Sequence, residues 1–301
     1  MKAIRFALVG MLAATAAHGW GPATHVMVAN QLKSTGQYKA EVMYGAVAPD
    51  LYLLLTPNPM DPWDPAFRAT HYPMGIYAPW AAAQTPEERA LAWGYLTHNE
   101  GWGADHTAHI TSNVFPGTGQ GYVILKAAQL RALMLQQLEQ MGMGSYAGLI
   151  TEANTHFIVE YGIDLVAKGM EPELGEKLVE AAGHRSAAMG PLLARAYGQG
   201  DPQVEQAFQQ AEAFWDPLMI RYGSILKLPM KKAVPQVAEF LVDLGVGLGV
   251  LQDPGADRPM LVQLIQLGLK DSMALCAEDF LQEIRATVES IQGSELSQLT
   301  Y

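Results

Sequence analysis

Histidine residues are concentrated in the first part of the chain, where their side chains are the best candidates for chemistry. The sequence holds eight histidines, and apart from His18 most of them fall before residue 110. They are His25, His71, His98, His106 and His109. Neutral imidazole is the commonest protein ligand for zinc, and carboxylates complete sites that hold more than one ion. The clustering therefore indicates a metal site.

Carboxylates lie at suitable positions among these histidines. Asp50 ends the sequence Ala-Pro-Asp, and Asp105 lies between His98 and His109. Residues 98, 105 and 109 would share one face of a continuous helix, although two glycines interrupt this stretch. These carboxylates are therefore candidates to complete the site.

A second pattern follows in a predicted helix, where His156 and Glu160 are four residues apart. That spacing places an imidazole and a carboxylate on one face, so that both can reach one ion. The same spacing also occurs by chance. Taken singly, His25, His71 and His184 are each more simply explained as hydrogen-bonded core or surface histidines, so the inference depends on the whole set.

The N-terminus has the features of a secretory signal peptide. Lys2 and Arg5 precede an apolar run at residues 6–14, and small residues follow up to Gly19. The run is too short to span a bilayer. Cleavage before Trp20 is expected, with cleavage after residue 16 or 17 or an ordinary N-terminal helix as alternatives. The protein is therefore predicted to be secreted or periplasmic.

Charge and cysteine content exclude some classes of function. The formal net charge is -11, and the stretch from Trp20 to His109 has only four Lys or Arg residues. Phosphate-backbone binding needs clustered basic residues, so nucleic acid is a poor match, although bound divalent ions would reverse the sign locally. Cys276 is the only cysteine, so no intramolecular disulfide can form.

Periodicity and proline positions predict an all-α fold. A short helix is expected over Pro22–Leu32, and six prolines between Pro57 and Pro79 predict a long, structured loop. The apolar stretch Phe240–Leu251 contains an aspartate and three glycines, which favours a buried core helix over a membrane span. Further helices are expected at residues 86–100, 122–140, 146–168, 172–182, 202–222, 235–251, 259–269 and 277–291.

In chain order, the candidate ligands resemble those of the zinc-dependent phospholipase C family. The resemblance covers Trp20 to about Glu160, roughly half of the chain that remains after the leader. It implies a multi-helix phospholipase C-like domain that binds three zinc ions. Its ligand series here is Trp20, His25, Asp50, His71, His98, Asp105, His109, His156 and Glu160.

The resemblance also implies how these residues share the ions. Trp20 would bind one ion through its free α-amine and carbonyl, with His25 beside it. The second ion would lie among Asp50, His71 and His98, and the third among His109, His156 and Glu160, while Asp105 bridges the first two. An α-amine has a pKa of about 8, so a metal can hold it deprotonated near neutral pH, and leader cleavage would then activate the site.

Two features depart from the family pattern. The position one helical turn after His98, where the bridging aspartate is expected, holds Trp102, and Asp105 follows three residues later. A neighbour of Asp105 is therefore an alternative bridging ligand. His106 is likewise an alternative to His109 as a zinc ligand. Residues 191–301 match nothing in the family and are interpreted as a C-terminal helical extension on a metal-binding core at 20–190, or as part of one continuous domain at 20–301.

The resemblance implies an exported phosphodiesterase that hydrolyses the phosphate ester of a phospholipid with metal-activated water. Asp50 would accept a proton from that water. Aromatic residues of the proline-rich segment would receive a lipid head group or contact a membrane surface, or would only fold that segment down. One alternative is a single-strand-specific zinc nuclease of the same superfamily, which the short Trp20–His25 spacing favours and Glu160 disfavours. Another is an inactive helical binding protein.

Overall fold

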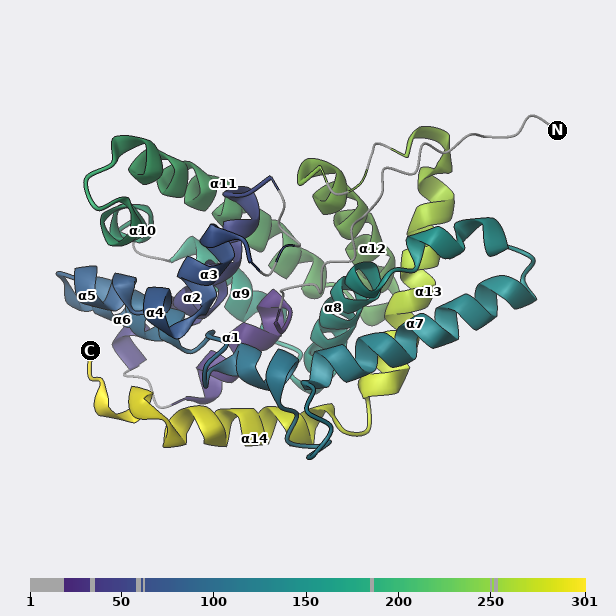
Figure 1. The fold of residues 1–301 in the computed structure, drawn as a ribbon, viewed down its shortest axis with the longest axis horizontal. Coiled ribbons are helices and arrows are strands. Elements are labelled where there is room, and N and C mark those ends of the chain that lie inside the picture. Colours follow the sequence, from purple (N-terminus) through teal and green to yellow (C-terminus); the bar gives the residue numbers. More distant parts are fainter. Residues whose placement is uncertain are drawn as a thin grey trace.

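The computed structural model describes residues 19–32, 36–57, 61, 63–184, 187–249, 251 and 254–301. The predicted leader therefore lies outside the described residues, except for Gly19 at its end. Throughout the described ranges the chain forms helices joined by turns and has no strand, so the all-α prediction is confirmed (Figure 1).

The α-helices follow one another along the chain as α1 (Pro22–Gln31), α2 (Lys39–Val47), α3 (Pro65–His71), α4 (Pro73–Ile76), α5 (Ala78–Ala82), α6 (Pro86–Leu96), α7 (Tyr122–Gln140), α8 (Glu152–Met170), α9 (Leu174–Gly183), α10 (Met189–Gly198), α11 (Pro202–Leu226), α12 (Met230–Gly247), α13 (Arg258–Cys276) and α14 (Phe280–Gly293). The shorter segments are the 3-10 helices η1 (Gly36–Tyr38), η2 (Ala48–Leu54), η4 (Gly144–Leu149), η5 (Gly255–Asp257) and η6 (Glu295–Gln298) and the π-helix η3 (His106–Ile110).

The proline-rich segment differs from its prediction as a loop, because it contains the short helices α3, α4 and α5. Each has a proline in its first two positions, namely Pro65, Pro73 and Pro79. Proline is disfavoured in helix interiors, where this chain has only Pro217 of α11 and Pro235 of α12 among the described residues, but the first turn uses no backbone N–H of its own and suits the fixed proline φ. The side chain of Asp64 completes the start of α3 by accepting hydrogen bonds from two backbone amides.

Helix α2 was not predicted, and glycines explain how it packs. A Cβ on Gly45 of α2 would lie 2.1 Å from the carbonyl oxygen of Leu91 in α6, and one on Gly94 of α6 would lie 2.1 Å from that of Val42 in α2. The two helices are therefore in backbone contact, which only glycine permits. Asp50 follows α2 and His98 follows α6, so this contact brings the two side chains toward the same place.

One buried hydrophobic cluster extends from Trp20 to Leu296 and includes side chains on both sides of residue 190. Helix α8 contacts α7 and α13, and α14 runs along one edge of the molecule (Figure 1). The division between a core at 20–190 and an extension at 191–301 stays a prediction, beside the alternative of one continuous domain.

The apolar stretch that begins at Phe240 forms the end of α12 as far as Gly247, short of the predicted end at Leu251, and Phe240, Leu241 and Val242 are buried. Among the described residues, no single helix has both the length and the apolar character needed to cross a membrane. Residues 255–276 and 280–293 meet that criterion only together, as a pair bent by 71°.

Candidate metal centre

Helix α1 carries His25, and a carboxylate from α8 fixes its position. Asp164 accepts hydrogen bonds from the backbone amides of Ala23 and Thr24 at 3.0 and 2.7 Å, from the Thr24 hydroxyl at 2.7 Å and from the Tyr222 hydroxyl at 2.9 Å. It therefore caps the first turn of α1, whose free amides need acceptors. Burial raises the pKa of Asp164 to about 6, against the opposing effect of these hydrogen bonds.

His98 is oriented by a backbone carbonyl. Its Nδ1 lies 2.8 Å from the carbonyl oxygen of Ala46 in α2, so this nitrogen carries the proton and donates it. The other ring nitrogen, Nε2, then faces Asp50 at 3.4 Å and Asp105 at 3.0 Å. Metal-binding histidines are commonly held in this way, with one nitrogen fixed by a hydrogen bond and the other presented as a ligand.

His71 presents its Nε2 to the same point. Its Nδ1 lies 2.7 Å from the hydroxyl of Thr70, which itself donates to the carbonyl oxygen of Ala66 at 2.9 Å. The hydroxyl therefore accepts from His71 Nδ1, which leaves Nε2 with a free lone pair. This nitrogen lies 3.1 Å from His98 Nε2 and 3.5 Å from an Asp50 oxygen. Two imidazole lone pairs at that distance repel each other unless a proton or a cation lies between them.

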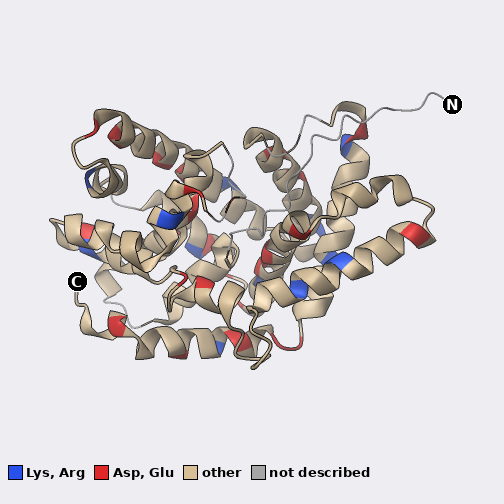
Figure 2. Ribbon diagram, viewed as in Figure 1, with Lys and Arg blue, Asp and Glu red and all other residues tan. Residues whose placement is uncertain are grey.

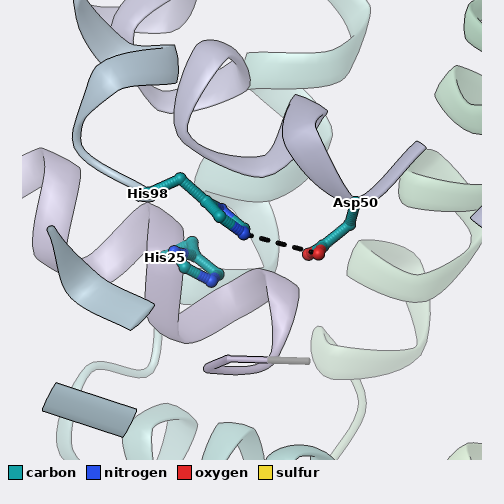
Figure 3. Close-up of side chains that lie close together, drawn as sticks. All are labelled: His25, Asp50 and His98. Carbon is teal, nitrogen blue, oxygen red and sulfur yellow. Dashed lines mark ion pairs between the residues drawn. The ribbon is translucent and has the colours of Figure 1, made fainter. Parts of the chain in front are cut away.

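Asp105 joins these groups to α1. One carboxylate oxygen is 3.3 Å from His25 Nε2, and the other is 3.0 Å from His98 Nε2 and 3.8 Å from His71 Nε2. The rings of His25 and His98 stack at 3.9 Å, and Figure 3 shows both beside Asp50. Asp105 is 0% exposed. Burial acts to raise its pKa, but the charges and hydrogen bonds of His98 and His25 hold that pKa well below its usual range.

The acid and base character of the other candidate ligands follows from the same balance. Burial would raise the pKa of Asp50, but His98 and His71 hold it below its usual range, so Asp50 is ionised. Burial would lower the pKa of His98, but Asp105 and Asp50 raise it well above its usual value. Without a metal, the lowest-energy state of the cluster is thus a protonated His98 between two carboxylates.

A second cluster lies at the π-helix η3 and α8. His156 Nε2 is 2.8 Å from a Glu160 oxygen, as their spacing on one helix predicts, and the rings of His109 and His156 are 5.2 Å apart. His106 takes no part: its Nδ1 lies 3.0 Å from the backbone carbonyl oxygen of Glu100. Between the two alternatives, the structure brings His109 to this cluster.

Glu100 is a further candidate ligand that the sequence analysis missed. One of its oxygens accepts a hydrogen bond from His109 Nδ1 at 2.5 Å, and its side chain is buried. It lies close enough to Asp105 and His109 for the three to hold one ion. Its position directly after Thr97-His98-Asn99 and before two glycines was the available signal, but only the fold shows that this turn folds back on His109.

Many buried polar atoms at this centre face only one another and have no hydrogen-bond partner outside the cluster among the described residues. They belong to His25, Asp50, Glu100, Asp105, His109 and Glu160. Buried polar atoms are normally paired, and unpaired nitrogen and oxygen atoms that converge are the donor set that a divalent cation takes. The groups that could hold an ion are His25, Asp50 and His98; His71, His98 and Asp105; His109, His156 and Glu160; and Glu100, Asp105 and His109.

Trp20 is anchored beside the first cluster. Its indole N–H donates to the carbonyl oxygen of Ala104 at 2.9 Å, and its ring packs against Tyr122 and Phe280. The backbone of Gly19 lies directly against Asp105, because a Cβ built on Gly19 would fall 1.6 Å from an Asp105 oxygen. The start of the described chain therefore lies at the centre, while the Trp20 side chain is used for packing.

The aromatic residues of the proline-rich segment have different neighbours. The Arg68 guanidinium lies 5.4 Å from the ring centroids of both Trp63 and Tyr72, and Trp63 is 72% exposed. Trp80 instead lies against Arg89, and the Tyr77 hydroxyl donates to Glu295. Only Trp63 is thus a large aromatic side chain presented to solvent here.

No family model, curated protein or solved structure matches this chain. Its geometry is therefore the basis for a functional proposal. Figure 2 shows that both the Asp and Glu positions and the Lys and Arg positions are spread over the helices, with some carboxylate positions near the middle of the ribbon.

Proposed function

We propose that this protein is a zinc-dependent hydrolase of phosphate esters, with a phospholipid as its substrate. The observation that carries the proposal is the position of Asp105, whose two oxygens face His25 on one side and His71 and His98 on the other. A buried carboxylate placed between separate imidazoles, without other hydrogen-bond partners, suits a ligand shared by two cations.

The proposed ligand set follows the resemblance to the zinc-dependent phospholipases C, with three zinc ions. The third site, at His109, His156 and Glu160, coincides with a group whose atoms are close enough to bind one ion, and His71 and His98 of the second site form such a group with the bridging Asp105. The proposed amine ligand at Trp20 is supported by the contact between Gly19 and Asp105. Glu100 is added to the set as a residue that orients His109.

Divalent ions bound in such a centre lower the pKa of water and stabilise negative charge on phosphoryl oxygens. In the proposed reaction, the water oxygen forms a bond to phosphorus and the phosphorus–oxygen bond to the alcohol breaks. Asp50 takes the proton of the water, and solvent supplies the proton that completes the alcohol. His98 and His71 keep Asp50 ionised, as an acceptor must be, and because the same lowered pKa makes it a weak base, the water must be made acidic by the bound ions. An Asp50→Asn protein with full zinc content and normal activity would contradict this role.

The choice of a phospholipid is supported by charge and by the exposed Trp63. The net charge of -11 disfavours the single-strand-specific nuclease, whose substrate is a polyanion. Trp63 suits contact with a membrane surface, because tryptophan combines apolar area with a polar N–H. Export to the periplasm or the medium, with cleavage before Trp20, belongs to the same proposal.

Hydrolysis assays on the zinc-loaded protein test the proposal. We expect release of a phosphorylated head group from phosphatidylcholine vesicles, loss of that activity on chelation and recovery on addition of zinc. Cleavage of single-stranded nucleic acid alone would favour the nuclease. A protein that binds zinc but hydrolyses neither substrate would favour the inactive binding protein.

A further inference from the structure

An apolar pocket lies between α7, α8, α12 and α13. The cavity within it has a volume of about 90 Å³ and is partly open to solvent. Its walls include Met134, Phe157, Ile158, Leu241, Leu264 and Ile265. Among its lining residues only Asn154 is polar, and its side-chain amide is already bonded to the carbonyl oxygen of Leu149 at 2.8 Å.

The pocket and the metal centre share two structural elements. On α8, the lining residues Ala153 and Phe157 lie beside the helix face that presents His156, because successive residues are about 100° apart around a helix. In η2, the lining residue Leu53 comes three residues after Asp50, which is one turn of a 3-10 helix. The side of the pocket formed by Leu53 and Ala153 is therefore the side nearest to Asp50 and His156.

The chemistry of the lining selects the kind of ligand. The described lining residues carry no charged side chain, so a phosphate, a sugar or a nucleobase would lose hydration there without gaining hydrogen bonds. A hydrocarbon chain loses nothing of this kind and gains burial. Much of the wall comes from α12 and α13, beyond the segment that resembles the phospholipases.

We propose that this pocket binds one aliphatic chain of the substrate while the phosphate group attached to that chain meets the metal centre. The assignment of the phosphate rests on the proposed function, whereas binding of the chain does not. The enzyme would thus draw a lipid chain into its own helices and select substrates by chain length.

Calorimetry on the full, zinc-loaded protein tests the proposal with two series of probes below their micelle concentrations. Linear alkanols, which carry no phosphate, report on the pocket alone, and linear alkyl phosphates report on the pocket and the metal centre together. Each buried methylene contributes about 0.8 kcal/mol, so we expect the dissociation constant to fall about fourfold for each added methylene, until the chain fills the pocket.

Two tryptophan variants on α13 form a matched pair. Leu261 and Leu275 are both partly buried and packed against the core, but only Leu261 lines the pocket. Leu261→Trp is expected to flatten the dependence on chain length, and Leu275→Trp to preserve it. Equal effects of the two variants, or alkanol affinity that does not change with chain length in the parent protein, would overturn the proposal.

The two probe series also separate this inference from the proposed function. Alkanol binding that strengthens with chain length, together with alkyl phosphates that bind no better than alkanols, would support the pocket assignment and contradict the hydrolase. Tight binding of inorganic phosphate without any gain from added methylenes would support the metal centre and overturn the pocket assignment.

Discussion

Replacing Asp164 with alanine tests how the fold positions the metal centre. The buried Asp164 carboxylate accepts from two backbone amides of α1, from Thr24 and from Tyr222. A buried donor that loses its acceptor costs about 1–3 kcal/mol, although the Tyr222 hydroxyl can turn to another acceptor or to water. We therefore expect Asp164→Ala to lower the free energy of unfolding by about 3–5 kcal/mol, a large part of the total for a domain.

The pKa of Asp164 adds a pH dependence to this loss. Because burial raises that pKa to about 6, the folded chain binds the proton more tightly than the unfolded chain. The stability contributed by protonated Asp164 is complete below the unfolded pKa of about 3.9 and decreases as the pH rises through about 6. The difference between the parent and Asp164→Ala should therefore be about 1 kcal/mol smaller at about pH 7 than at about pH 5.

Urea unfolding followed by circular dichroism measures these differences, and elemental analysis of the same samples measures bound metal. A suitable control is Asp201→Ala, which removes an exposed cap from the start of α11 and should cost only about 1 kcal/mol. Because α1 carries His25, Asp164→Ala should also lose metal, whereas Asp201→Ala should not. Equal losses of stability in the two variants, or full metal content in Asp164→Ala, would refute the positioning role.

Three further predictions concern the ligands and the helices that carry them. Glu100→Gln should weaken zinc binding about 10–100-fold in a chelator competition, because Glu100 orients His109, whereas the exposed Glu139→Gln should leave it unchanged. Zinc binding to the metal-free protein should release protons and weaken as the pH falls, because the carboxylates that raise the pKa of His98 keep it protonated until a cation replaces the proton. Calorimetry in two buffers of different ionisation enthalpy measures this proton release. No proton release would contradict the charge state assigned to His98. Gly94→Ala should lower the unfolding temperature, because its Cβ would lie 2.1 Å from a carbonyl oxygen of α2. The control Gly183→Ala should not lower it, because a Cβ at Gly183 meets no atom within 4 Å. Equal effects of the two variants would contradict the close packing of α2 against α6.

Periodic features of the fold were predictable from the sequence. The bounds of α7, Tyr122–Gln140, agree with the predicted residues, and His156 and Glu160 lie together because they share a face of one helix. Helix α2 was missed because its stability depends on backbone contact between Gly45 and α6, and glycine indicates no helix by itself. The proline-rich segment was predicted as a loop because first-turn prolines and loop prolines look alike in sequence.

Residues of the centre that depend on tertiary contacts were harder to find. Glu100 reaches His109 because the backbone between them turns and continues into a π-helix, a conformation with little signature in sequence. Asp164 caps a helix that lies 140 residues earlier in the chain. The place of Asp105 among His25, His71 and His98 likewise follows from the fold, since its spacing from His98 departs from the family pattern.

The most direct test of the central claim is the metal content of the purified, mature protein, measured by mass spectrometry of the elements and joined to N-terminal sequencing. The account predicts about three zinc ions for each chain that begins at Trp20, and loss of metal in Asp105→Ala, whose carboxylate faces three of the candidate histidines. A correctly cleaved chain that binds no stoichiometric metal would contradict it.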